Sequence, residues 1–475
     1  MGLSALINTA SSGLNAYQVA SNVTAENIAN VNTPGYSRQT AVLENATPVM
    51  QNGFSLGTGV NVVAVSRFYD GLMQQQLVNA GTTQSYDTQK STVLQQIEPT
   101  FNEVANDGLG AAITNFIGSW QDLTVNPGGI SERQVIVTNA QILADNFHMV
   151  SKSLNDATTS QNDSLVPLTD SINNTLTNIS QLNQQIFNIN SVGANANEIK
   201  DQRDKLVTDL SQKMGIKFTD NADGTTDVYI SHGVTNTYLV KGSRAGSLTV
   251  AADPTSGNYA VTAHDVTTGA TTAIDNNVYT AQDGGQLWAT LQLRDTVIPG
   301  YMSQVDVLAK SVIDAVNAQQ SAGYSPTGGT LQNFFTPTAN VSGSAAGFSI
   351  AAGLTTDTIA ASGNAALPGD SSNALKMVQL ASAHTVPSGA PTATFNSYFG
   401  SLVSKIGLDV QSSTTVVTQD AAFTKQLTTL RDSNSGVSLD EELTNLMMYQ
   451  RSYQASSKVL TTATDMMDMV LGLIK

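Results

Sequence analysis

Apolar residues at the N-terminal end of the chain recur about every 3.5 residues, which is the period of a coiled-coil seam. The turn Thr33-Pro34-Gly35 then ends the pattern, because Pro34 disfavours helical backbone at Thr33 and Gly35 tolerates a positive φ. The sequence therefore predicts a terminal helix of about 28 residues. The residues assigned to its seam, with one tyrosine beyond the turn, are Leu3, Ile7, Leu14, Tyr17, Ile28, Val31 and Tyr36.

Apolar residues at the C-terminal end have the same spacing, and one row of them repeats every seven positions. Ser438 and the acidic residues 440–442 favour a helix that begins at Leu439, since they suit an N-cap and the positive end of the helix dipole. A long helix cannot bury its apolar stripe alone, so we expect the two terminal helices to pack on each other and on neighbouring molecules. The C-terminal seam row is Leu439, Leu446, Tyr453, Leu460, Met467 and Ile474, and the interleaved, more polar row is Leu443, Gln450, Ser457, Thr464 and Leu471.

The middle of the chain predicts a helical frame interrupted by strands. Apolar residues keep helical spacing over 135–150, 165–186 and 297–316. From about residue 218 the pattern alternates, and Asp223-Gly224 is a hairpin signal. The predicted fold class is mainly α with a β-rich inserted domain, in an elongated multidomain subunit. We assign residues 1–35 and 436–475 to a terminal coiled-coil domain, 36–217 and 288–435 to a mainly helical shaft that forms a helical bundle, and 218–287 to a β-rich inserted outer domain.

Composition narrows the classes of partner. The chain has 475 residues and a net charge of −16, so nucleic-acid phosphates and anionic membrane surfaces repel it. It has no cysteine, which excludes disulfides, thiolate metal sites and cysteine nucleophiles. No apolar stretch approaches the ~20 residues of a membrane-spanning helix. The first positive side chain is Arg38, so a secretory signal peptide is not expected either. We predict no nucleic-acid partner and no stable membrane insertion.

No pattern of catalytic or cofactor-binding residues is recognisable. The four histidines are isolated in sequence, and they are His148, His232, His264 and His384. The acidic run 220–224 superficially resembles a calcium loop, but Ser231 stands where a bidentate Glu is needed. No Gly-x-Ser-x-Gly motif occurs. The sequence therefore predicts a protein that is not an enzyme and has no cofactor, metal or catalytic site.

Motifs at both ends of the chain resemble those of a known class of proteins. Residues 22–39 and 449–460 are similar to the N-terminal and C-terminal signatures of bacterial flagellar axial proteins of the rod, hook and hook-associated class. Residues 179–186 and 197–206 resemble the helical section of the flagellar hook-associated protein 1 family, and residues 284–295, 316–335 and 363–374 resemble later parts of that family. The chain is short for the family and has no room for a large second outer domain.

The resemblance implies a structural subunit of the bacterial flagellum that joins hook to filament. It implies signal-less passage through the flagellar export apparatus, a cytoplasmic export chaperone on the C-terminal helix, and assembly as a ring of copies. The implied neighbours are the hook protein and the second hook-filament junction protein. The implied location is extracellular, at the hook-filament junction, after a transient stay in the cytoplasm.

Several alternatives stay open at the level of sequence. Arg38 and Arg451 are candidates for pairing with carboxylates of another subunit, and equally for solvated surface charge. The terminal motifs alone also fit another axial component, such as hook or distal rod protein. The β-rich unit could instead serve as a surface-binding or adhesin module. An exported enzyme is disfavoured because catalytic groups are missing.

Overall fold

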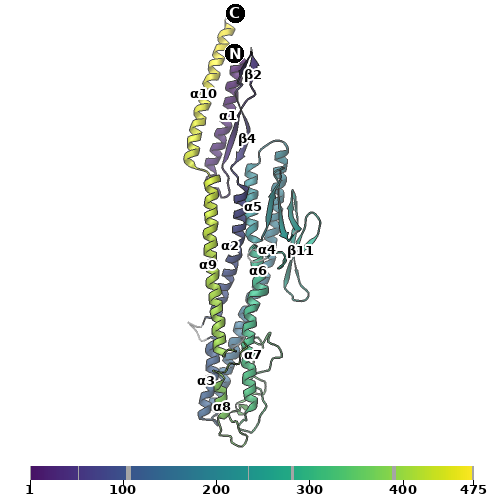
Figure 1. Ribbon diagram of the computed structural model, residues 1–475, viewed down its shortest axis with the longest axis vertical. Helices are drawn as coiled ribbons and strands as arrows, with labels where there is room; N and C mark the ends of the chain where they lie inside the picture. The colour runs from purple at the N-terminus through teal and green to yellow at the C-terminus, as the bar shows by residue number, and fades with distance from the viewer. Residues whose placement is uncertain are drawn as a thin grey trace.

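The computed structural model describes residues 2–51, 53–102, 108–233, 235–279, 283–387 and 392–472. Over these ranges the chain forms a long rod, with helices along the rod axis and the two ends of the chain near one tip (Figure 1). The predicted fold class is confirmed: the rod is mainly helical, with long terminal helices and a β-rich part on one side.

Helices supply most of the regular structure. Their bounds are α1 (Leu3–Ala29), α2 (Gly71–Ile97), α3 (Leu109–Val125), α4 (Ile130–Ser191), α5 (Asn197–Lys213), α6 (Gly285–Gln292), α7 (Ile298–Ala322), α8 (Ser372–Gln379), α9 (Phe395–Ser435) and α10 (Leu439–Gly472). A π-helical turn, η2 (Leu293–Val297), joins α6 directly to α7, and short 3-10 turns are η1 (Glu98–Thr100) and η3 (Thr356–Thr358). The helix α4 runs through both segments predicted at 135–150 and 165–186 as one helix of 62 residues.

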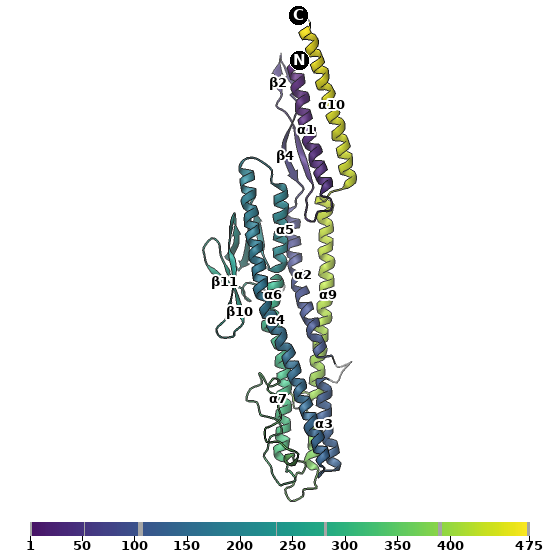
Figure 2. The same ribbon diagram turned by 180° about the vertical axis from the view of Figure 1, so that it is seen from behind.

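The terminal part of the rod contains strands that the sequence patterns did not predict. Strand β1 (Gln39–Asn45) pairs antiparallel with β4 (Val60–Arg67), and β2 (Val49–Gln51) pairs with β3 (Phe54–Leu56). Helix α1 lies between this ribbon and α10, as the two opposite views show (Figures 1 and 2). Residues 39–67 were expected to continue the helical shaft. Apolar and polar residues alternate only weakly along these strands, because the narrow ribbon has no continuous core to cover.

Two large apolar cores, and a small cluster of Leu77, Ala80 and Leu427 between α2 and α9, hold the shaft together. The distal core lies in the part of the shaft farther from the two chain ends, and the proximal core in the part nearer to them (Figure 1). The distal core joins the end of α2 with α3, α4, α7 and α9, and it contains Trp120, Phe116 and Phe147. The proximal core joins α2, α4, α5 and α6 to the β-rich part, and it contains Leu176, Leu210 and Trp288. Among the residues that the structure describes, neither core includes any residue of α1 or α10.

The β-rich part consists of two antiparallel sheets beside α4. One sheet has the order β5-β6-β7-β8 and the other β11-β10-β9. The hairpin predicted at Asp223-Gly224 is confirmed, since β5 pairs with β6 and Gly224 has a φ of 88°. The strands are β5 (Lys217–Asp220), β6 (Thr226–His232), β7 (Thr235–Lys241), β8 (Arg244–Ala245), β9 (Ser247–Ala252), β10 (Tyr259–His264) and β11 (Thr271–Ala273).

Asp265 ties the two sheets together. Its carboxylate accepts hydrogen bonds from the backbone N–H groups of Thr267 and Thr268 in its own turn, each at 2.7 Å, and from Tyr238 N on β7, also at 2.7 Å. Burial alone would raise the pKa of Asp265, but these hydrogen bonds outweigh it and lower the pKa. The carboxylate is therefore held ionised by the fold.

We expect Asp265→Ala to destabilise the β-rich part by about 2 kcal/mol, because three backbone donors lose a charged acceptor. Since the folded-state pKa is lowered, the stabilisation is complete above the ordinary Asp pKa of about 3.9 and is lost as the pH falls below it. Hydrogen exchange of residues 235–273 measures both effects. Asp253→Ala is the matched control, because Asp253 holds a similar turn but bonds only within that turn. Equal effects of the two substitutions would contradict this role.

Candidate assembly interface

Helices α1 and α10 pack closely because α1 presents small residues to its partner. Ala10, Gly13, Ala16 and Ala20 are buried. A Cβ atom placed on Gly13 would lie only 2.9 Å from Ser456 Oγ on α10. Closer to the shaft, the rings of Tyr17 and Tyr449 stack with their centroids 6.5 Å apart. The terminal helices therefore pack on each other within one chain, through small side chains and one aromatic pair.

The predicted seam residues are only partly covered by this contact. On α1 and the following turn, the seam residues from Leu3 to Tyr36 are half-buried. On α10, Leu446, Leu460 and Met467 are half-buried, Leu439 and Tyr453 are exposed, and Ile474 lies outside the described residues. The row of α10 most covered by α1 is a different one, which the sequence patterns missed because small and polar residues form it. That row is Glu442, Tyr449, Ser456 and Ala463.

A buried polar cluster fixes the point where α1 ends and α10 begins. Glu442 is 2% exposed, and its carboxylate accepts hydrogen bonds from Asn27 Nδ2 at 3.0 Å and from Arg38 Nε at 2.7 Å. Asn27 also bonds both backbone groups of Gln39, and its Oδ1 accepts from the Tyr36 hydroxyl at 2.9 Å. Burial raises the pKa of Tyr36, so this phenol stays protonated as a donor. We call these five residues the terminal polar cluster.

The sequence left Arg38 open between a contact across subunits and a solvated surface charge. Its guanidinium is paired inside the chain, with Glu442 and with Glu441 at 3.0 Å. The physical reason is position: β1 starts beside the first turn of α10, where the acidic residues gather. Arg451 lies exposed on α10, and its role between subunits stays a prediction.

A second polar network joins the terminal part to the shaft. Arg67, at the end of β4, lies 2.7 Å from Asp201 and 2.8 Å from Asp204, both on α5. Asp201 also accepts a hydrogen bond from Ser37 N at 2.8 Å. The guanidinium of Arg67 stacks over the ring of Tyr69, 4.2 Å from its centroid. The first turns of α5 therefore bind both ends of the segment that contains the β1–β4 ribbon, through Ser37 and Arg67.

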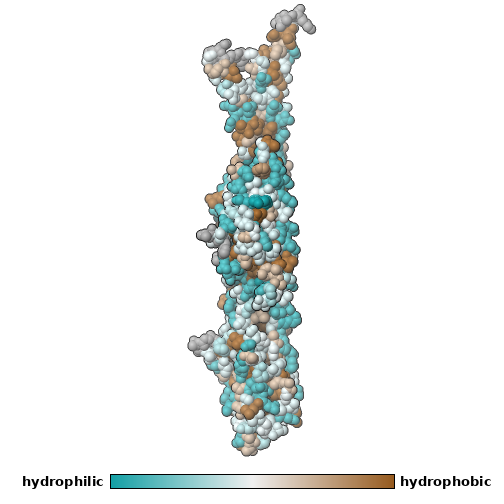
Figure 3. Space-filling model, turned by 90° about the vertical axis from the view of Figure 1, so that its right-hand side faces the viewer, coloured by the Kyte–Doolittle hydropathy of each residue, from teal (hydrophilic) through white to brown (hydrophobic). Residues whose placement is uncertain are grey.

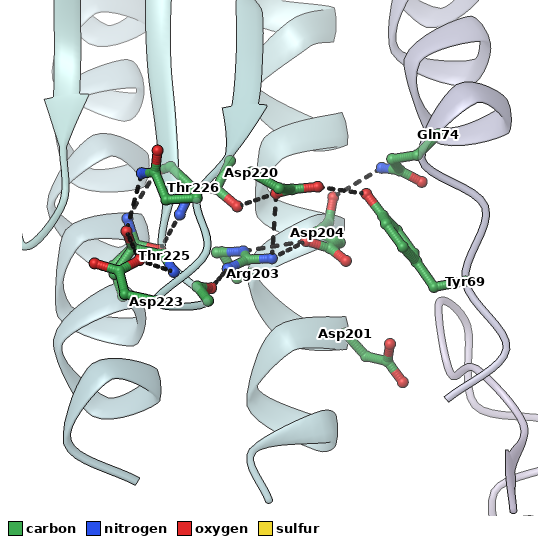
Figure 4. A network of polar contacts seen from close by, with 12 residues as sticks. Tyr69, Gln74, Asp201, Arg203, Asp204, Asp220, Asp223, Thr225 and Thr226 are labelled. Carbon is green, nitrogen blue, oxygen red and sulfur yellow. Dashed lines mark hydrogen bonds and ion pairs between the residues drawn. The ribbon is translucent and has the colours of Figure 1, made fainter. Parts of the chain in front are cut away.

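The same turns of α5 also hold the β-rich part (Figure 4). Arg203 is buried, pairs with Asp204 at 2.8 Å, and donates to the carbonyl of Gly224 at 2.6 Å in the β5-β6 turn. The hydroxyl of Tyr69 donates to Asp220 at 3.2 Å, and burial raises the pKa of this phenol, so it stays protonated. The internal motif at 197–206 therefore serves to connect three parts of the molecule, a role that its sequence did not reveal.

The face in Figure 3 is largely hydrophilic or neutral, with scattered hydrophobic patches along the rod. Within the described ranges, no group of three or more His, Cys, Asp or Glu side chains could hold a metal ion. None of the described helices combines the length and apolar character required to cross a bilayer.

Family models match the chain at the middle and at both ends. The model described as the flagellar hook-associated protein FlgK helical domain matches residues 94–335, just over half of the chain. The chain belongs to the FlgK family of flagellar hook-associated proteins. The models for flagella basal body rod protein and for the C-terminal region of flagellar basal body rod FlgEFG protein match residues 7–36 and 431–473. The FlgK match runs from the end of α2 to beyond α7 and includes the whole β-rich part.

Relatives that match over nearly their whole length agree with this assignment. Flagellar hook-associated protein 1 of Bacillus subtilis is 27% identical over 501 residues, covering 98% of this chain and 97% of the relative. The protein of the same name from Salmonella typhimurium is 28% identical over 565 residues, covering 99% and 100%. The hook junction protein FlgK from Burkholderia pseudomallei has a similar fold, with a TM-score of 0.67 at 18% identity over 76% of this chain and 100% of that one.

The FlgK family assignment gives this chain a structural role in the bacterial flagellum, at the junction of hook and filament. It also decides between the alternatives that the terminal motifs left open. Those motifs are shared with rod and hook proteins, whereas the helical domain matched at 94–335 is that of the hook-associated protein.

Proposed function

We propose that the chain fills this role as the subunit of a ring, whose copies contact one another through their terminal helices. The observation that carries the proposal is an apolar stripe left uncovered on α10. Met448, Val459 and Met466 are 51%, 43% and 47% exposed. Their spacings of 11 and 7 residues put them on one flank of the helix, beside the face that packs on α1. We call these three residues the outer stripe.

The outer stripe supports a contact between molecules for two reasons. Exposed apolar rows rimmed by polar residues mark interaction surfaces, because water is released when they are covered. In addition, α10 lies outside both cores of the shaft, so its apolar residues are not needed to fold the rest of the chain. The predicted seam residues Leu439 and Tyr453 are also exposed and available to neighbouring copies.

We further propose an export chaperone, the hook protein and the second hook-filament junction protein as partners. A subunit waiting in the cytoplasm presents the outer stripe to water, so an export chaperone that covers α10 would prevent early self-association. After passage through the export apparatus, the ring would bind the hook protein on one side and the second hook-filament junction protein on the other. The assembled protein would then lie outside the cell.

The double substitution Val459→Glu and Met466→Glu tests the ring contact. Both side chains are exposed in the single chain, so we expect the thermal unfolding and circular dichroism of the monomer to be unchanged. Burying two carboxylates between copies costs several kcal/mol, so incorporation at the hook tip should fall by more than about tenfold. Immunogold electron microscopy of hook tips, in cells that make only the variant, measures it.

Gln454→Glu with Thr461→Glu is the matched control, since it adds the same charge at exposed polar positions of the same helix. We expect this control to assemble normally. Normal incorporation of the Val459→Glu and Met466→Glu chain would overturn the proposed contact. Loss of incorporation by both double variants would assign the effect to charge rather than to the outer stripe.

A further inference from the structure

A polar layer separates the two cores of the shaft. On α4 the inward row runs from Leu154 through Gln161 to Leu165. Leu154 belongs to the distal core and Leu165 to the proximal core, while Gln161, between them, is only 5% exposed. An amide therefore occupies the position where one continuous core would need an apolar side chain.

Hydrogen bonds between amides and one phenol connect three helices at this height. Gln89 on α2 donates to Gln161 Oε1 at 3.0 Å and accepts from Gln286 Nε2 on α6 at 3.4 Å. Beside this pair, the Tyr86 hydroxyl donates to Gln292 Oε1 at 2.8 Å. We call these five residues the mid-shaft layer.

The helices through the layer carry backbone irregularities within about two turns of it. The π-helical turn η2 (Leu293–Val297) begins directly after Gln292. In α4, Pro167 lies inside the helix six residues after Gln161, where it removes one backbone hydrogen bond. Both features are recognised causes of bends in helices. Helix α4 and the continuous helix from α6 through η2 to α7 therefore bend more easily close to the layer.

Helix α9 places no fully buried apolar side chain near the layer. Val410 is its last residue in the distal core, and its next buried apolar residue is Leu427. Between them the hydroxyl of Ser413 is buried and has no hydrogen-bond partner within the described structure. A buried apolar side chain packed between α9 and its neighbouring helices at this height would resist tilting of the helices. Helix α9 supplies no such side chain there.

We propose that the mid-shaft layer is a hinge, about which the distal and proximal parts of the shaft tilt as two rigid bodies. Each core stays closed during the motion. The amides keep hydrogen bonds over a range of tilts, because a glutamine both donates and accepts and has three rotatable bonds. The hinge goes beyond the proposed ring function, and its consequence would be that one chain can fit neighbours that meet it at different angles.

Distances between spin labels test the hinge in the full chain. The chain has no cysteine, so labels attach only where cysteines are introduced. Asp145→Cys on α4 and Lys425→Cys on α9 are exposed and lie on opposite sides of the layer, so their diagonal distance responds to tilt. Asp145→Cys with Ser404→Cys is the control pair, with both labels on the distal part. Double electron-electron resonance gives the width of each distance distribution.

We expect the diagonal distribution to be about twofold broader than the control distribution. Replacing Gln89 and Gln161 by leucine joins the two cores with apolar contact and should narrow the diagonal distribution to the control width. Gln121→Leu with Gln134→Leu makes the same chemical change at exposed positions and should leave both widths unchanged.

A diagonal distribution as narrow as the control in the unsubstituted chain would overturn the hinge and leave the layer as a device that sets helix register. A broad distribution that the Gln89→Leu and Gln161→Leu chain retains would assign the motion to another place. The measurement uses the monomer, so its result does not depend on whether the ring contact is correct.

Discussion

Deletion of residues 439–475 is expected to abolish incorporation at the hook tip while the shaft stays folded. The reason is the distribution of the cores, which contain no described residue of α1 or α10. The truncated chain keeps every apolar contact of the distal and proximal cores. It loses the whole outer stripe and the partner surface of α1.

The truncation has a spectroscopic signature. Circular dichroism should lose the helical signal of the 34 residues of α10 and most of that of the 27 residues of α1. A lone helix like α1 gains most of its stability from packing and should fray when α10 is removed. The unfolding transitions of the shaft should keep their midpoints. Hydrogen exchange resolves the two regions, with fast exchange in α1 and unchanged protection in α3 and α7.

The full-length chain expressed from the same promoter is the control for hook-tip incorporation. Normal junctions built from the truncated chain would contradict an assembly role for α10. Loss of the shaft transitions would contradict the independence of the cores. These two failures are separable, because one is measured in cells and the other with the purified monomer.

Glu442→Leu should weaken the attachment of α10 to the rest of the chain by about 3 kcal/mol. The substitution removes the acceptor of the buried Asn27 amide and the buried carboxylate that Arg38 Nε contacts, and removing one partner of a buried ion pair is costly. Leucine is similar in bulk, so lost packing contributes little. The expected result is faster hydrogen exchange throughout α10 and reduced assembly, with an unchanged shaft.

Glu441→Leu is the matched control for that experiment. Glu441 also contacts Arg38, but its side chain is 62% exposed, so its ion pair is screened by water. We expect a cost below about 1 kcal/mol. Equal effects of the two substitutions would show that burial at Glu442 does not matter and would contradict the role of the terminal polar cluster.

Local signals along the chain were sufficient for the terminal helices and for one hairpin. Helix α1 ends before Pro34 and α10 begins at Leu439, as predicted, because capping and turn residues act on their own neighbours. The β5-β6 hairpin forms around Gly224 for the same reason. The ribbon at 39–67 was missed, since a strand pair without a covering core leaves only a weak alternating pattern.

Residues that join distant segments were the hardest to predict. Glu442 suits the positive end of the α10 dipole, and the sequence does not show that it lies beside Asn27, 415 positions earlier. Arg67, Asp201 and Asp204 are similarly ordinary charges until the fold brings β4 to α5. An amphipathic pattern shows which side of a helix is covered, but it does not identify the covering element.

The sequence by itself determined the helical class, the ends of the terminal helices, the absence of cysteine chemistry and the motifs of flagellar axial proteins, because each of these depends on residues close together in the chain. Only the tertiary structure decided which row of α10 meets α1, that Arg38 is paired within the chain, and that a glutamine layer divides the shaft into two cores. These features depend on contacts between residues tens to hundreds of positions apart, and burial in those contacts gives the same side chain a different energy from the one it has at the surface.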